Sequence, residues 1–274
     1  MARTAYFDSN VWGHVASLSG GVTSDDVKRL RSSVADRKLR IRISVSNIEE
    51  FAGPAPHGIE VTKKLFRLCY ELTDWKRPIK DVNDLLFDEI ESFTQRRSSP
   101  SPLCVAPPRL EEILRGEMPV QTLAAVAKSS KEHKEQMMAM SNSAREDARV
   151  ELSHATGTRP GFDALLPLAS WIAESIADGM GLGDECRAVG LEALRRRRAI
   201  RLLEGANLSL IYSQVFRGRM PVRGDFFDMQ HAVLASAAEF FVCHDANFRS
   251  DLSRLTIPGF TVTSLTALLD SLNT

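Results

Sequence analysis

Five acidic residues stand where apolar runs of the sequence give way to turns or helix starts, although they are far apart along the chain. They are Asp8, Glu50, Asp225, Asp228 and Asp245. The carboxyl ends of parallel strands meet at one edge of a sheet, so residues from both chain ends can gather there. Gathered carboxylates repel one another and raise each other's pKa unless a hard cation lies among them. The pattern therefore predicts a metal site closed by the two ends of the chain.

Each of these acids also has a purely structural explanation. Asp8, Asp225 and Asp245 each precede an expected helix and could cap it, because an N-cap carboxylate accepts hydrogen bonds from free backbone amides. Glu50 could be a solvated residue in a helical first turn. Capping is the stronger explanation for any one of them, and only the joint pattern favours a site.

The first 52 residues have the alternation expected of an α/β sheet. Residues 4–7 are prone to form a strand, and residues 23–38 resemble a helix whose first turn is acidic. Apolar and polar residues alternate over 39–43, which is typical of a strand with one polar face. Ser46 and Glu49 have the spacing of a capping box, which predicts a new helix there.

The middle of the chain has mainly helical features, and the α/β features return after it. The expected helices of the middle are 59–73, 82–96, 120–152, 162–180 and 184–203, with a loop rich in Pro and Ser over 98–108. After it we expect a helix over 225–238, a strand over 239–243, a helix over 246–252, a strand over 260–263 and a helix over 265–272. We therefore predict one α/β domain from residues 1–52 and 207–274, with 53–206 as a helical insertion.

Four segments of the chain carry a family resemblance in their order and residue types. They are Asp8-Ser9-Asn10 after the first strand, Ser44 with Glu50-Phe51, Asp228 with Ala232 and Ala235, and Val242-Cys243-His244-Asp245 with Phe248. Together they resemble the PIN-domain nucleases, although Cys243 replaces the usual Thr or Ser. The resemblance implies a PIN-like three-layer α/β/α fold with a central parallel sheet, interrupted here by a large all-helical insertion.

The same resemblance implies metal-dependent hydrolysis of RNA phosphodiester bonds by an endoribonuclease, with DNA as an open alternative. Carboxylate oxygens suit Mg²⁺ or Mn²⁺ rather than Zn²⁺. The implied catalytic residues are Asp8, Glu50, Asp228 and Asp245. Asp225 is a further candidate metal ligand, and Ser9 and Asn10 are expected to orient Asp8 through hydrogen bonds.

Other functions compete with this one. A catalytically weak PIN-like binding or regulatory module is the main alternative; its helical insertion would dock a protein inhibitor or a second copy of the chain. A phosphatase with an aspartyl nucleophile is disfavoured, because Asp8-Ser9-Asn10 lacks the second carboxylate that serves as general acid. A toxin controlled by an antitoxin is another possible role, although the toxins of the family are typically compact.

Two histidines accompany the acids. His231 lies three residues after Asp228 on the same expected helical face, where a hydrogen-bonded core histidine is a better explanation than a metal ligand. His244 precedes Asp245 directly and is equally ambiguous. Neither histidine is assigned a catalytic role from the sequence.

The charge of the chain is balanced overall but uneven along it. Lys and Arg number 35 and so do Asp and Glu, yet residues 187–223 contain nine Arg and only two acids. Such a segment is either the solvated face of a helix or a surface that contacts phosphates. The candidate RNA-binding residues are Arg195, Arg197, Arg198, Arg201, Arg217, Arg219 and Arg223.

The composition favours a soluble, cytoplasmic protein. With 274 residues and 43% hydrophobic content, the chain can bury a substantial core. No apolar stretch approaches the roughly 20 residues of a membrane span, and no signal peptide is recognisable. The four cysteines are too scattered for a zinc site, and we expect them to be reduced.

Overall fold

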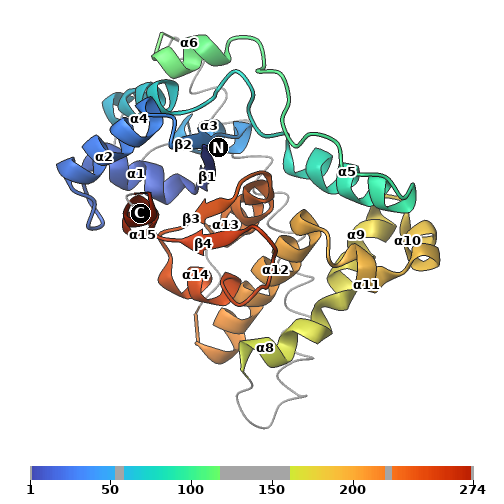
Figure 1. The fold of residues 1–274 in the computed structure, drawn as a ribbon. Helices are drawn as coiled ribbons and strands as arrows, with labels where there is room; N and C mark the ends of the chain where they lie inside the picture. The colour runs from blue at the N-terminus through green and yellow to red at the C-terminus, as the bar shows by residue number, and fades with distance from the viewer. Residues whose placement is uncertain (1, 53–58, 118–160, 220–223, 273–274) are drawn as a thin grey trace.

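The computed structural model describes residues 2–52, 59–117, 161–219 and 224–272, and it contains a four-stranded parallel sheet in the order β2-β1-β3-β4 (Figure 1). The central strand β1 (Arg3–Phe7) pairs with β2 (Leu39–Arg42) on one side and with β3 (Phe240–Val242) on the other. The outer strand β4 (Thr261–Thr263) pairs with β3. The predicted α/β class with a parallel sheet drawn from both chain ends is therefore confirmed.

Helices cover both faces of this sheet, so the second half of the central strand β1 is buried on both sides. In β1, Ala5 and Phe7 face one hydrophobic core, whereas Tyr6 faces another. The first core is formed with α1 (Ser9–Ser17), α2 (Ser24–Ala35), α3 (Val45–Ala52), α4 (Ile59–Leu72), α6 (Leu110–Arg115) and α15 (Leu265–Ser271). The second is formed with α12 (Arg198–Phe216), α13 (Gly224–Leu234), η2 (Ala235–Ala237) and α14 (Ala246–Leu252).

Local hydrogen bonds explain where several helices begin. Thr23 and Asp26 form the capping box that opens α2, as its acidic first turn suggested. The capping box expected at Ser46 and Glu49 is wrong by two residues. Ser44 and Asn47 form it instead, since the Ser44 Oγ accepts from the Asn47 amide and the Asn47 Oδ1 accepts from the Ser44 amide. Both pairs have the i, i+3 spacing, but only the earlier pair is buried beside the end of β2.

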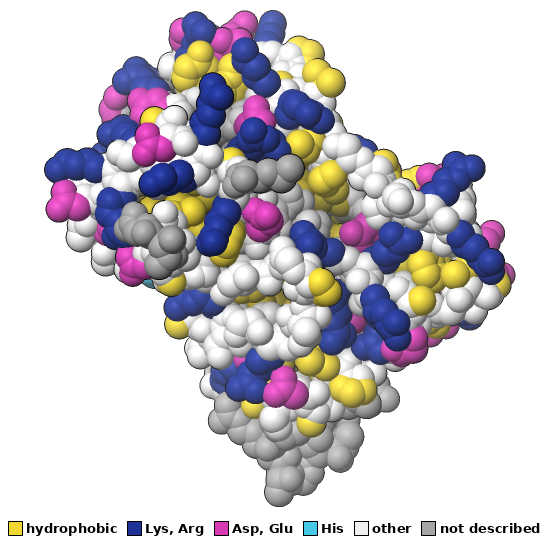
Figure 2. Space-filling model, viewed as in Figure 1, with side chains coloured by type: hydrophobic (Ala, Val, Ile, Leu, Met, Phe, Trp, Pro, Cys, Tyr) yellow, Lys and Arg dark blue, Asp and Glu magenta, His cyan; other side chains and the backbone are white. Residues whose placement is uncertain are grey.

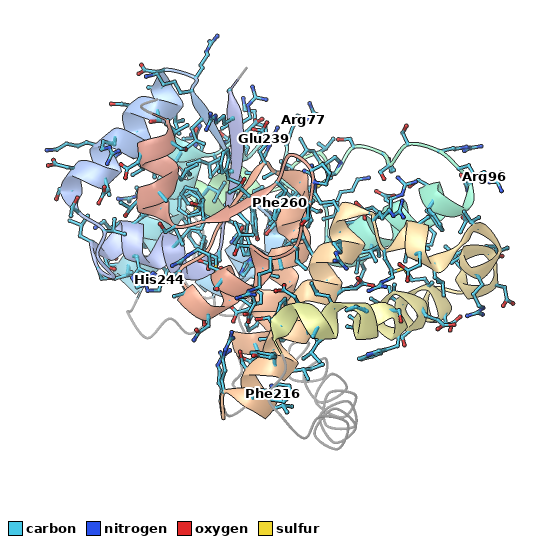
Figure 3. All side chains as sticks on the ribbon, turned by 60° about the horizontal axis from the view of Figure 1, so that its bottom comes forward. Arg77, Arg96, Phe216, Glu239, His244 and Phe260 are labelled. Atoms are coloured by element: carbon cyan, nitrogen blue, oxygen red, sulfur yellow. The ribbon has the colours of Figure 1, made fainter. Side chains whose placement is uncertain are left out.

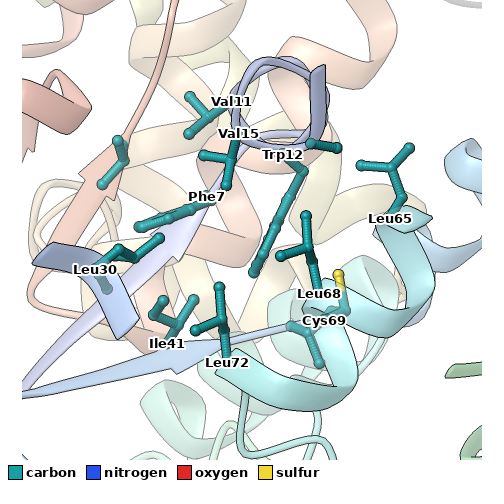
Figure 4. Packing of buried hydrophobic residues seen from close by; sticks show 14 of the residues in the cluster. Phe7, Val11, Trp12, Val15, Leu30, Ile41, Leu65, Leu68, Cys69 and Leu72 are labelled. Carbon is teal, nitrogen blue, oxygen red and sulfur yellow. The ribbon is translucent and has the colours of Figure 1, made fainter. Parts of the chain in front are cut away.

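The predicted boundary at residue 53 does not separate two units. Trp12 of α1 packs against Leu68 and Leu72 of α4 in the core that covers the sheet (Figure 4). Residues 73–79 also extend the sheet beyond β2, because the Asp74 amide donates to the Ile41 carbonyl at 3.2 Å and the Ile79 amide to the Ile43 carbonyl at 2.8 Å. The α/β unit therefore continues to residue 79.

The second predicted boundary, at residues 206 and 207, lies inside the continuous helix α12, which packs on both the sheet and the outer helices. The outer helices are α5 (Val82–Thr94), α8 (Phe162–Leu165), η1 (Leu166–Ala169), α9 (Ser170–Gly179), α10 (Gly183–Val189) and α11 (Leu191–Leu194). Two long helices were expected where α8 to α12 stand. Pro167 lies in the η1 turn that divides the first, and Gly190, at φ +115°, divides the second.

None of the helices in the described part of the chain has both the length and the apolar character that crossing a bilayer requires. The helix expected over 120–152 lies outside the described residues.

Candidate functional site

Asp8 lies at the carboxyl end of β1 and is only 3% exposed. Its Oδ1 accepts a hydrogen bond from the Val11 amide at 2.7 Å, so the expected capping role is real. Its Oδ2 accepts from the backbone amide of His244 at 3.1 Å, in the turn after β3. Burial raises the pKa of Asp8, although these amides and the charge of His231 offset part of the effect. The two chain ends therefore meet at a carboxylate that is costly to ionise.

Glu50 and His231 form an ion pair beside Asp8. The His231 Nε2 lies 2.9 Å from the Glu50 Oε1, and His231 is 2% exposed. Burial by itself lowers the pKa of His231, but the carboxylates of Glu50, Asp8 and Asp228 outweigh it and raise that pKa. The raised pKa favours the imidazolium form of His231, which places a positive charge within the acidic site.

A buried chain of hydrogen bonds connects His231 to the backbone next to Asp8. The His231 Nδ1 lies 2.6 Å from the Tyr6 hydroxyl, which lies 3.1 Å from the Ser44 Oγ. Ser44 donates to the Asn47 Oδ1 at 3.1 Å, and the Asn47 Nδ2 donates to the carbonyl of Phe7 at 3.3 Å. When the protonated His231 donates from its Nδ1 to Tyr6, the Tyr6 hydroxyl can donate to Ser44, so every hydrogen bond of the chain has one donor and one acceptor. The network fixes α3 and α13 relative to the end of β1.

Sequence reasoning did not find Tyr6 and Asn47, and it left His231 without a role. The one sequence feature that could have indicated Asn47 is its i, i+3 spacing from Ser44, which is the same spacing as in the competing pair. Tyr6 and His231 are 225 residues apart, so their contact leaves no local pattern.

Asp228, in the first half of α13, completes the acidic group. Burial, and next the negative charge of Asp8, raise the pKa of Asp228 to about 7, while His231 and Arg219 partly oppose this. The charge of Asp8 therefore acts on the Asp228 carboxyl and favours its protonated form. The charges of Asp8, Glu50 and Asp228 all act on His231, and that of Asp8 acts on Asp228, while the predicted convergence of these acids with Asp245 on one metal ion stays a prediction.

Asp225, one helical turn earlier, is held differently. It is 1% exposed, and its Oδ1 lies 2.7 Å from the Arg219 Nη2. Because this guanidinium already neutralises its charge, Asp225 is the weaker candidate of the two acids in α13 for binding a cation. It lies in the first turn of α13 and joins that helix to the segment after α12.

Asp245 lies on the same edge of the sheet as Asp8, since it follows the neighbouring parallel strand β3. It caps α14 by accepting from the Phe248 amide at 2.9 Å, which confirms the structural explanation. The turn before it is rigid, because an Arg249 Nη1 donates to the carbonyls of Cys243 at 2.7 Å and His244 at 3.1 Å. Asp245 remains half-buried at the border of the acidic group.

The residues expected to orient Asp8 have other positions. Ser9 lies with its Oγ 3.1 Å from the His231 Nε2 and 3.4 Å from the Asn47 Nδ2, so it supports the network rather than Asp8. Asn10 is exposed on α1. The Asp8 carboxylate instead accepts from the backbone amides of Val11 and His244, and the Cys243 side chain also hydrogen-bonds to it.

The charge and donor type of this group fit a divalent cation. Asp8, Glu50 and Asp228 offer hard oxygen ligands, and burial raises the pKa values of Asp8 and Asp228, so a nearby positive charge would favour the ionised form of both carboxyls. Yet in the described part of the chain no three His, Cys, Asp or Glu side chains stand in ligating arrangement. The electrostatics of a cation site are thus present, while a closed set of ligands is not.

A serine nucleophile does not fit the geometry. In a Ser-His-acid triad the serine and the acid address different nitrogens of the imidazole. Here Ser9 and Glu50 both lie against the Nε2 of His231, and Tyr6 occupies its Nδ1.

The arginine-rich segment is mostly structural. Arg195 is buried, and its guanidinium donates to Glu204, which is 0% exposed, to Glu192 and to the carbonyl of Leu166. The sequence offered two interpretations of Arg195, a phosphate-contacting residue or part of a solvated helix face, and its burial contradicts both. Arg201 also contacts Glu204.

The other candidate arginines also have partners within the protein. Arg197 donates to Ser99, Arg198 to the Pro258 carbonyl, Arg217 to Asp251 with both Nη atoms, and Arg219 pairs with Asp225; Arg223 lies outside the described residues. On the face drawn in Figure 2, Lys and Arg are interspersed with Asp and Glu. A phosphate-binding face over this segment stays a prediction, weakened by these contacts.

Comparison with known proteins adds no relative: no family model matches the chain, and neither a curated protein nor a solved structure matches it significantly. The chemistry of the site itself must therefore indicate the function.

Proposed function

We propose that this protein is a Mg²⁺- or Mn²⁺-dependent nuclease that hydrolyses RNA phosphodiester bonds, with a PIN-like α/β unit. The observation that carries the proposal is the electrostatic interaction of Asp8 and Asp228 at the carboxyl edge of the sheet, where burial raises the pKa of Asp8 and where burial, and next the charge of Asp8, raise the pKa of Asp228. Such an arrangement destabilises the fold, and functional sites are where proteins tolerate it.

Asp8 and Asp228 would hold the cation, and Glu50 and Asp245 would border it. The ion would supply Lewis acidity toward the phosphate and activate a water molecule. The protein itself positions these groups: the amides of Val11 and His244 fix both oxygens of Asp8, and His231 orients Glu50 through its Nε2. The imidazolium of His231 also limits the net negative charge that an approaching phosphate meets.

The direct test is cleavage of a fluorescent single-stranded RNA by the purified protein with Mn²⁺ or with EDTA. We expect Mn²⁺-dependent cleavage that Asp8→Asn and Asp228→Asn each abolish, while Asp36→Asn at the opposite edge of the sheet retains it. Circular dichroism of each variant separates loss of activity from loss of the fold. Cleavage that persists in EDTA, or in Asp8→Asn, would refute the proposal.

One observation favours a second candidate, a binding or regulatory module with little catalytic power. Within the part of the chain that the structure describes, the acids do not form a group of three ligands, and Glu50 and Asp225 are already paired with basic side chains. A protein that binds RNA but leaves it intact at millimolar Mn²⁺ would support this candidate.

A further inference from the structure

Two imidazole rings stand together at the border of the acidic group. The ring centroids of His14, in α1, and His244, in the turn between β3 and α14, are 4.1 Å apart with their planes inclined by 46°. His244 is exposed, whereas His14 is half-buried. Figure 3 shows His244 at the surface beside these elements. An exposed aromatic ring supported by a second ring is an unusual feature next to a buried carboxylate.

Hydrogen bonds hold the ring of His14 and the backbone of His244. The His14 Nδ1 lies 2.8 Å from the Ser19 Oγ, and Gly20 packs so closely that an added Cβ would lie 2.5 Å from that nitrogen. His244 is fixed through its backbone, whose amide donates to Asp8 and whose carbonyl accepts from Arg249. The backbone that carries His244 is therefore fixed beside Asp8, next to the proposed cleavage site.

The geometry favours stacking over metal binding. Two imidazoles that ligate one tetrahedral zinc ion at about 2.0 Å per nitrogen have ring centroids about 5 Å apart. The observed separation of 4.1 Å is shorter than this, and the two rings contact each other directly in a tilted arrangement. Burial, and next the proximity of His244, lower the pKa of His14, so its imidazole is neutral at pH 7 and suited to stacking.

We propose that His244, supported by His14, is a stacking platform for one base of a single-stranded nucleic acid whose phosphate lies at Asp8. The inference rests on the proposed nuclease function and adds to it the substrate class. Bases inside a duplex already stack on each other, so a ring of this kind selects an unpaired strand. Every base has a π-face, so the platform predicts little sequence preference.

The test measures binding without cleavage, in EDTA, by fluorescence anisotropy. The probes are a mixed-sequence single-stranded RNA of twelve nucleotides, the DNA equivalent, an abasic strand of the same length and a duplex. His244→Ala should weaken binding of both single strands by roughly 5-fold to 100-fold. His244→Phe, which keeps a stacking ring, and Ser250→Ala, a control on the exposed side of α14, should bind like the wild type. Binding of the abasic strand should be the same for all four proteins.

Several results would overturn the platform. The first is an equal loss of single-strand affinity in His244→Ala and His244→Phe, and the second is no loss of affinity in either variant. The third is that His244→Ala loses as much affinity for the abasic strand as for the intact strands. The fourth is a wild-type protein that binds the duplex as tightly as the single strands. Failure of the wild type to bind any single strand would overturn it as well. The nuclease proposal fails separately: if strands bind as expected but stay intact with Mn²⁺, the base platform stands and the catalytic assignment does not.

Discussion

Replacing Asp228 by asparagine removes a carboxyl whose pKa burial and Asp8 raise from 3.8 to about 7. In the wild type, the native state holds the Asp228 proton more tightly than the unfolded chain does. The free energy of unfolding of the wild type therefore falls as pH rises from about 4 to about 7. A shift of about three pKa units corresponds to about 4 kcal/mol of destabilisation above pH 7. At pH 5, which is only about one unit above the pKa of the carboxyl in the unfolded chain, the destabilisation of the native state is about 1–2 kcal/mol.

The asparagine side chain would have no proton to lose, so Asp228→Asn should be more stable than the wild type, by about 2–3 kcal/mol more at pH 8 than at pH 5. Urea unfolding in EDTA at the two pH values measures this difference. The exposed Asp36→Asn variant controls for general effects of removing an acid. A gain of equal size at both pH values, or a loss of stability at pH 8, would refute the electrostatic account of the site.

Two further predictions concern the scaffold and are checked by urea unfolding at pH 7. Arg195→Ala should destabilise the fold by about 3–5 kcal/mol because it removes the 2.7 Å partner of the fully buried Glu204 and leaves it only the more distant Arg201. The exposed Arg196→Ala should change stability by less than about 0.5 kcal/mol, and similar values for both variants would contradict the buried ion pair. Gly20→Ala and Gly21→Ala both place a Cβ at positive φ, but only the former meets an imidazole ring, so it should cost more than the roughly 1 kcal/mol expected of backbone strain alone; equal costs would show that the ring moves freely.

The sequence was sufficient for those features whose cause is local. Alternating polarity in residues 39–43 indicated β2, and the positions of Asp8 and Asp245 after apolar runs indicated both their capping roles and their common sheet edge. The contact of residues 73–79 with the sheet was not predicted, because two isolated bridges attach them to it and no run of alternating polar and apolar residues marks them as a strand.

Features that depend on tertiary partners were not predictable from one sequence. The run around Arg195 looked like a charged surface because the acid that neutralises it, Glu204, lies nine residues away on the next helix and is itself buried. The position of His231 among the acids depends on contacts with Tyr6 and Glu50, which come from the other end of the chain. Charge counts along a chain do not reveal which charges already have partners.

Calorimetric titration of the wild type with Mn²⁺ at pH 7, in two buffers of different ionisation enthalpy, tests the central claim most directly. Asp8 and Asp228 should bind the ion and release protons, because Asp228 is about half-protonated at this pH. Asp8→Asn and Asp228→Asn should each lose binding, and Asp225→Asn, whose charge Arg219 already neutralises, should lose less. Mn²⁺ binding that is unchanged in Asp8→Asn, or no binding by the wild type at millimolar Mn²⁺, would contradict a cation site at this edge of the sheet.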